Sequence, residues 1–259
     1  PTVDGSNLRG RDASFDWAVF TDAGVASAHE SVHTSQQVQA PSPTPPPPAN
    51  YYISRDGTIK VVKSENAFSS YYMESNDKPG EFNFLANLEH NDVGLVYFPD
   101  QMDFFGRYGT KDAGGDYKNK GEDPGKGDHY LRPEVAAALF GVAAVLKDTH
   151  GITIEFGDMS SSNGSDPWQK GFEHHKGHGH KGNRSGMDVD FRYINDKGVS
   201  FQSNTAVSDR QFSIKNNQAV YDTAARFGFN KNYQGVGGKI VGVSTAAKHL
   251  DHGHLGFGR

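Results

Sequence analysis

The sequence predicts an α+β fold in which a small antiparallel sheet with flanking helices follows a small β-rich region. Runs of β-branched and aromatic residues fill residues 51–100, whereas helical and strand-like periodicities alternate after residue 130. A chain of 259 residues is long enough to bury a sizeable core, and its 31 glycines indicate many loops.

Shifts in composition divide the chain into four segments. Residues 1–40 are polar and weakly patterned, and residues 41–50, "PSPTPPPPAN", favour an extended, semi-rigid spacer. Residues 51–105 form the β-rich region, and residues 106–259 form a second, α+β domain.

The β-rich region opens with "YYISRDGTIKVVKSE", two strand-like runs around Asp56 and Gly57 that are typical of a hairpin. The stretch "EFNFLANLEHNDVGLVYF" predicts a second pair of strands. Residues 107–128 are rich in Gly, Lys and Asp, which predicts a long loop.

A helix over residues 133–149 begins the α+β domain. Pro133 suits a first helical turn, apolar residues recur along one face, and Gly151 can end the helix. The other expected elements are strands over 152–156, 186–194 and 239–244, a helix over 216–229, and a strand near the C-terminus.

The composition argues against several functions. A net charge of -5 gives no basic face for nucleic acid, and no run of about 18 apolar residues predicts a membrane span. The chain has no cysteine, so a metal site must use His, Asp or Glu. No signal peptide is visible at the start, "PTVDGSNLRGRDASF".

The histidines are strongly clustered. Four of the 12 lie within residues 174–180 and three within residues 249–254. Each cluster adjoins a predicted strand and an aspartate, which favours a metal site over a solvated, charge-rich loop.

Alternation along strands brings these side chains together. "HGH" places His252 and His254 on one face of a strand, and "DVD" does the same for Asp188 and Asp190. A catalytic zinc site needs three protein ligands and an open position for water, whose pKa the ion lowers toward about 7.

The stretches "SGMDVDF" and "HLDHGHLGF" resemble the two motifs of LAS-type zinc metallopeptidases, the group of lysostaphin-type enzymes, D-alanyl-D-alanine peptidases and the hedgehog fold. The likeness is strongest to penicillin-insensitive murein endopeptidases and covers residues 107–259. His249, His252 and His254 match the second motif, His-x-x-His-x-His. Gly186 and Asp190 match the first, in which a ligand His precedes the Gly by three residues and the Asp by seven.

The first motif departs from the family at its histidine. Asn183 stands there, and an amide oxygen is a poor zinc ligand beside imidazole. Either residues 182–184 are an insertion and His180 is the ligand, with His178 as its main rival, or the site is degenerate. His174 and His175 are then surface residues or substrate contacts.

The resemblance implies one Zn2+ per chain, held by His180, Asp190 and His254. It also implies that Asp251 is the catalytic carboxylate and takes the proton of the attacking water. His252 stabilises the oxyanion or assists proton transfer, and His249 contacts substrate or supports the site. Asp188 is expected to support the site rather than to bind the ion.

A second metal pattern lies near the start of the chain. "AHESVHT" holds His29 and His33 in the HExxH spacing that binds zinc on a helix. We interpret it as a chance match, because its flanks are Ser, Thr and Gln and a proline spacer follows.

The resemblance implies a zinc peptidase that hydrolyses peptide bonds of peptidoglycan, with no nucleic-acid partner. Residues 51–100 resemble segments that precede toxin domains in large secreted bacterial proteins. This likeness implies a secreted or delivered effector that acts in the periplasm or cell wall, with a secretion or injection apparatus and an immunity protein as partners. Two alternatives remain: a degenerate zinc-binding module that recognises cell wall or a protein, and a metallopeptidase directed at proteins.

Overall fold

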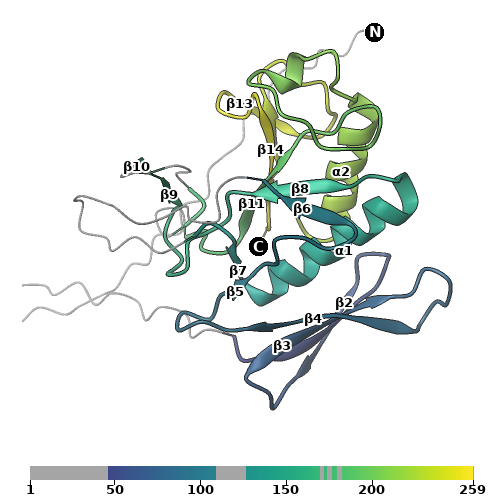
Figure 1. Cartoon of the computed structure of the whole chain (residues 1–259), viewed down its shortest axis with the longest axis vertical. Helices are drawn as coiled ribbons and strands as arrows, with labels where there is room; N and C mark the ends of the chain where they lie inside the picture. The colour runs from purple at the N-terminus through teal and green to yellow at the C-terminus, as the bar shows by residue number, and fades with distance from the viewer. Residues whose placement is uncertain (1–45, 109–126, 170–171, 174–176, 180–182, 259) are drawn as a thin grey trace, which may run out of the picture. The chain divides into compact units, whose positions relative to one another are not determined.

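The computed structural model describes residues 46–108, 127–169, 172–173, 177–179 and 183–258, which belong to the compact unit 43–259. In Figure 1 the helix α1 (Pro133–His150) lies between a four-stranded sheet and a six-stranded sheet. The fold is therefore α+β, as predicted, with two α-helices and several sheets in the described part of the chain.

The four-stranded sheet has the order β2-β1-β3-β4. Strands β1 and β2 form the predicted hairpin, with Ile53 opposite Ile59 across the Asp56–Gly57 turn, whereas β1 and β3 run parallel. A Cβ on Gly57, at φ +99°, would overlap the backbone of Arg226, so the turn packs closely against the end of a distant helix. The strands are β1 (Ala49–Ile53), β2 (Ile59–Lys63), β3 (Phe68–Glu74) and β4 (Phe82–Glu89).

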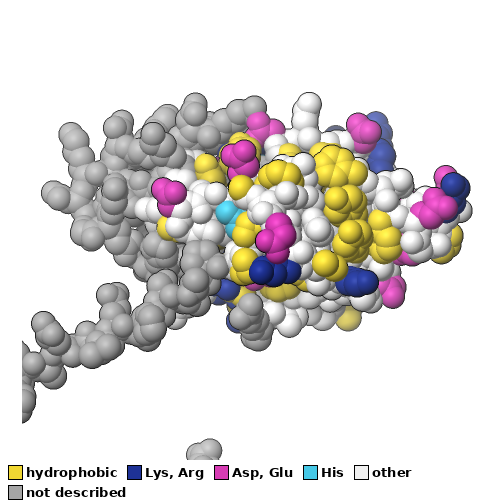
Figure 2. All heavy atoms as spheres, turned by 90° about the horizontal axis from the view of Figure 1, so that it is seen from below, with side chains coloured by type: hydrophobic (Ala, Val, Ile, Leu, Met, Phe, Trp, Pro, Cys, Tyr) yellow, Lys and Arg dark blue, Asp and Glu magenta, His cyan; other side chains and the backbone are white. Residues whose placement is uncertain are grey.

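The two faces of this sheet differ. Tyr51 and Tyr71 are buried and stacked, and Tyr71 contacts Phe140 of α1. On the opposite face Tyr52 stacks on Tyr72, and hydrophobic side chains are visible on the surface of the molecule in Figure 2. This alternation follows from the period of two along a strand.

Helix α1 is buried on every side. Its residues 135–146 are all buried, and a Cβ on Gly141 would overlap the ring of Phe227. Gly151 ends the helix in the left-handed conformation, as the sequence predicts; its N–H donates to the Lys147 carbonyl, and the N–H of Ile152 donates to the Leu146 carbonyl. A helix that is apolar all round belongs in a core, and α1 is the centre of this one.

The six-stranded sheet has the order β13-β12-β14-β11-β8-β6. Its four central strands are antiparallel, but the outer pairs β6–β8 and β12–β13 are parallel, so the sheet is mixed rather than purely antiparallel. Its strands are β6 (Phe105–Arg107), β8 (Ile154–Gly157), β11 (Asp188–Arg192), β12 (Tyr233–Gly235), β13 (Ser244–Ala246) and β14 (His252–Gly256).

The remaining elements surround this sheet. Helix α2 (Ile214–Arg226), predicted over 216–229, packs against α1. Strand β5 (Val96–Tyr97) pairs with β7 (Tyr130–Leu131) rather than with β4, and a single bridge joins Val96 to His90, the residue that follows β4. The others are η2 (Ala206–Ser208), β9 (Trp168–Gln169) and β10 (Phe172–Glu173).

The strand predicted over 239–244 is wrong. The side-chain amide of Gln234 pairs with both the N–H and the C=O of Ile240, and Gln218 does the same for Val241. Because these side chains satisfy the backbone, the segment needs no strand partner, and strand β13 begins only at Ser244.

The predicted loop over 107–128 lies mostly outside the described residues. Within the part of the chain that the structure describes, no helix is long and apolar enough to cross a bilayer.

Candidate metal centre

Strands β11 and β14 place the candidate ligands on one face of the six-stranded sheet. Their antiparallel register sets Asp190 opposite His254 and Arg192 opposite His252. Alternation turns Val189, Phe191 and Leu255 to the other face, where they are fully buried in the core. Burial of the apolar side chains on one face of the two strands thus fixes the register, which in turn aligns the polar side chains on the other face.

The first group of possible ligands is His178, Asp190 and His254, whose candidate ligand atoms all lie within 4.8 Å of one another. Oδ1 of Asp190 lies 2.9 Å from Nδ1 of His254 and 3.7 Å from Nε2 of His178. All three residues are buried, with Asp190 at 0% exposure. Ligands about 2.0–2.1 Å from a tetrahedral zinc ion lie roughly 3.3 Å apart, so these spacings fit such an ion.

The loop around His178 is held from several sides. Gly177 donates its N–H to Asp166 over 2.8 Å, and a Cβ on Gly179 would overlap the backbone at Asp166. The Ser160 hydroxyl donates to the carbonyl of His178 and accepts the N–H of Gly186 at 2.6 Å. Glycines on both sides of the histidine therefore allow a packed loop that buries the ring.

Close packing and backbone conformation explain why residue 186 is a glycine. Its φ is +67°, and a Cβ there would come within 2.5 Å of the backbone nitrogen of Arg132. Only glycine fits this close approach without strain.

His178 and His254 each have one ring nitrogen anchored away from Asp190. Nδ1 of His178 donates to the Asp158 carbonyl, which leaves Nε2 facing Asp190. Nε2 of His254 donates to Asp188 over 3.2 Å, and Arg184 holds Asp188 through two hydrogen bonds of 2.7 and 2.8 Å. Partners of this kind orient metal-binding imidazoles and fix their tautomers.

The charges reinforce this arrangement. Although burial opposes its charged form, hydrogen bonds with Asp188 and Asp190 raise the pKa of His254 to about 9. Burial also opposes ionisation of Asp188, but hydrogen bonds with His254 and Arg184 hold its pKa below the usual value. The site therefore attracts positive charge, which a proton or a metal ion can supply.

His252 is anchored by a different carboxylate. Its Nδ1 lies 2.8 Å from Oδ1 of Asp251, and its Nε2 lies 3.4 Å from Oδ2 of Asp190. Asp251 in turn accepts a 3.3 Å hydrogen bond from Arg192, whose guanidinium lies 4.3 Å above the ring of Tyr108. Asp251 is thus turned toward His252 and Arg192.

His249 completes a second group with Asp190 and His252, whose candidate ligand atoms again lie within 4.8 Å of one another. Its ring lies 4.9 Å from that of His252 and 5.6 Å from that of His254. Burial lowers the pKa of His249 to about 4, so its imidazole is neutral at pH 7 and offers a lone pair.

The structure thus brings together Asp190, His249, His252 and His254 from the expected set, with Asp251 and Asp188 directly behind them. His178, the rival candidate, completes the first group. His180 lies outside the described residues, as do His174, His175, His29 and His33. Asn183 is exposed, at φ +53°.

Sequence reasoning missed three contributors to the site. Asp158 acts through its backbone carbonyl, which no pattern of residue types reveals. Arg184 was assigned only to an insertion, and Tyr108 stands at the edge of a loop-like stretch with no signal of its own. The i,i+4 spacing of Arg184 and Asp188 was the one available clue.

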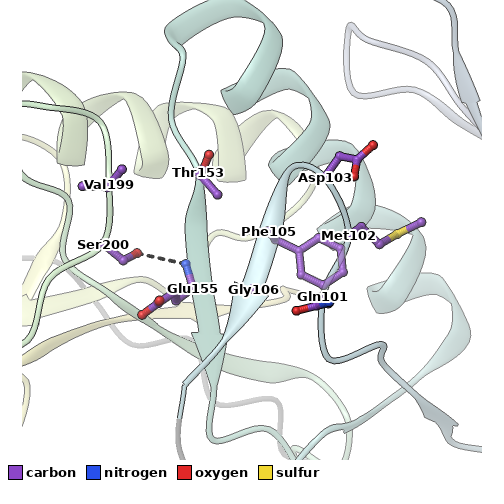
Figure 3. A pocket seen from close by; sticks show the side chains of 9 residues that line it. All are labelled: Gln101, Met102, Asp103, Phe105, Gly106, Thr153, Glu155, Val199 and Ser200. Carbon is purple, nitrogen blue, oxygen red and sulfur yellow. Dashed lines mark hydrogen bonds between the residues drawn. The ribbon is translucent and has the colours of Figure 1, made fainter.

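One cavity of about 580 Å3 lies along strands β6 and β8 (Figure 3). Its lining includes Gln101, Phe105, Glu155 and Ser200, and none of the candidate ligands. It is therefore separate from the metal centre.

The buried His and Asp groups can hold a metal ion, and the polar side chains behind them fit that role. No protein-family model matches this chain, and no curated protein is significantly similar to it.

Proposed function

We propose that this protein is a zinc-dependent peptidase that hydrolyses peptide bonds of bacterial peptidoglycan. The observation that carries the proposal is the set of three imidazoles, His178, His252 and His254, that face one fully buried carboxylate, Asp190. Each ring has its other nitrogen anchored by an oxygen acceptor. Such pre-oriented rings are the arrangement that zinc sites use.

His178, Asp190 and His254 would hold the ion. A bound zinc ion supplies Lewis acidity and activates water for attack on a carbonyl at neutral pH. The three side chains provide two neutral nitrogens and one anionic oxygen, a donor set that suits zinc.

His252 is placed to move the proton. Asp251 accepts from its Nδ1, which turns its Nε2 toward the proposed metal ligands, where it would take a proton from the attacking water and return it to the leaving amine. The family resemblance implies that Asp251 takes this proton itself. Its contacts with His252 and Arg192 favour a positioning role instead.

The likeness to D-alanyl-D-alanine peptidases and the hedgehog fold belongs to the proposal; Asp190 of the first motif lies opposite His254 of the second on adjacent antiparallel strands, as a shared metal site requires. We include in the proposal that the chain is the effector part of a secreted or delivered bacterial protein. Its expected partners are a secretion or injection apparatus and an immunity protein.

Metal analysis and digestion of purified muropeptides test the proposal together. We expect about one tightly bound zinc per chain and new peptide fragments, both lost in Asp190→Ala. His150→Ala, at the exposed end of α1, is the matched control and should retain both. A protein without zinc, or a zinc-loaded protein that leaves every muropeptide intact, would overturn the proposal.

A zinc-binding module without activity is the second candidate. Asn183 favours it, since the expected motif histidine is replaced by a residue whose side chain is exposed. In that case zinc binds but no peptide is cut. If the zinc-loaded protein binds muropeptides, and Asp251→Ala binds them equally well, the result would support this second candidate.

A further inference from the structure

We propose that Asp190, His249 and His252 form a second, weaker cation site that shares the Asp190 carboxylate with the first. The inference rests on the metal site of the proposed function but not on peptidase activity. It assigns a divalent cation such as zinc to His249 and His252, which the first ion would not bind, together with the shared Asp190.

The carboxylate of Asp190 is divided between two sets of imidazoles. Oδ1 faces Nδ1 of His254 and Nε2 of His178, whereas Oδ2 lies 3.4 Å from Nε2 of His252. A carboxylate that offers one oxygen to each of two ions is the usual bridge in two-metal sites, whose ions lie about 3.5–4 Å apart.

The two histidines of the second group are arranged as ligands. Nδ1 of His252 is bound to Asp251, which directs Nε2 toward Asp190. The Nδ1 atom of His249 is buried and has no hydrogen-bond partner among the residues that the structure describes. A buried nitrogen without a partner is costly, and a bound cation would satisfy it.

The surrounding charges favour a cation here. Asp188 and Asp251 have their arginine partners, Arg184 and Arg192. Asp190 is fully buried and has histidines around it, and Asp158 also acts electrostatically on His252. The Asp158 carboxylate thus adds negative charge near the second group beyond that of Asp190.

The second site should be the weaker one. The first ion already neutralises Asp190 and repels a second ion through the shared carboxylate. In addition His249 is only half-buried, whereas all three residues of the first group are buried. Occupancy also engages Nε2 of His252, so excess zinc should inhibit hydrolysis.

Metal titration of the full chain tests the proposal. The protein is stripped with a chelator, equilibrated with increasing free Zn2+, and its bound zinc is counted by mass spectrometry. We expect a tight zinc and a second that binds at least tenfold more weakly. His249→Ala should lose only the second, and Asp190→Ala should lose both.

Two controls make the count specific. His174→Ala with His175→Ala removes neighbouring histidines of the cluster at 174–180 and should lower neither site, and His249→Gln repeats the test with a side chain of similar polarity. If both His249 variants bind less than one zinc fewer than the wild type, the second site is overturned. Saturation of the wild type at a single zinc overturns it as well.

These outcomes separate the two proposals. One zinc with muropeptide cleavage rejects the second site and keeps the peptidase. Two zinc ions without cleavage at any zinc concentration keep the second site and reject the peptidase.

Discussion

The two sides of the metal centre are built differently. Asp190, His252 and His254 come from paired strands, whose register the buried Phe191 and Leu255 fix from the opposite face. His178 comes from a loop that hydrogen bonds and the close-packed Gly179 hold in place. Core packing therefore sets the positions of the strand ligands, whereas the position of the loop ligand depends on individual hydrogen bonds and contacts of the loop.

The largest expected change in zinc affinity comes from removing one ligand from each side of the metal centre. We expect His254→Ala to reduce zinc affinity by more than the roughly 100-fold typical of outer-sphere partners, and His178→Ala to do likewise. His180→Ala should change it much less, because His178 already completes the buried group. Equilibrium dialysis measures all three. Loss of zinc in His180→Ala with retention in His178→Ala would restore the ligand expected from the sequence.

A matched pair of glycine substitutions separates ligand placement from folding. Gly179→Ala would bring a Cβ within 2.1 Å of the backbone nitrogen of Asp166, so it should displace the loop and weaken zinc binding, at a smaller cost in the stability of the metal-free protein than a substitution in the core. Gly253→Ala places a Cβ 2.5 Å from the Phe191 ring and from the Tyr221 hydroxyl, so it should cost about 1–3 kcal/mol of unfolding free energy. Chemical denaturation and zinc dialysis report the two effects. Equal effects of both variants on stability would contradict the distinction between the two sides.

Substitution of Asp188, the carboxylate behind His254, should have a smaller effect on zinc affinity. Asp188→Asn keeps the shape of the side chain but weakens its hold on Nε2 of His254 and on Arg184. We expect zinc affinity to fall about 10- to 100-fold without loss of the fold. Asp196→Asn, in an exposed turn, is the control. An unchanged affinity would mean that the strand pairing alone orients His254.

The smallest effect is that of a change of one pH unit. In the metal-free protein the pKa of His254 is raised from 6.5 to about 9. The stability that its charged form contributes is therefore complete below pH 6.5 and is lost as the pH rises through about 9. Zinc competes with that proton, so its affinity should increase about tenfold per pH unit across this range. A flat affinity profile would show that His254 is not a ligand.

The same contrast explains what the sequence could predict. Strand β14 and helix α1 follow from periodicity and from Pro133 and Gly151, because those signals are local. The segment around Ile240 has the apolar pattern of a strand, but the partners of its backbone are the side chains of Gln234 and Gln218. No local pattern in the sequence reveals such side-chain partners. The sequence does not favour His178 over His180, because the burial of its loop depends on contacts with Ser160 and Asp166, which lie far away in the chain.

The burial of α1 on all sides has a consequence for any shortened form of the protein. The four-stranded sheet covers one side of this helix through Ile53 and Tyr71, although the candidate ligands all come after residue 177. A fragment that starts at residue 106 would present that apolar side to water and would tend to aggregate. Cleavage that releases an intact metal centre must therefore fall before Ala49, the first residue of β1.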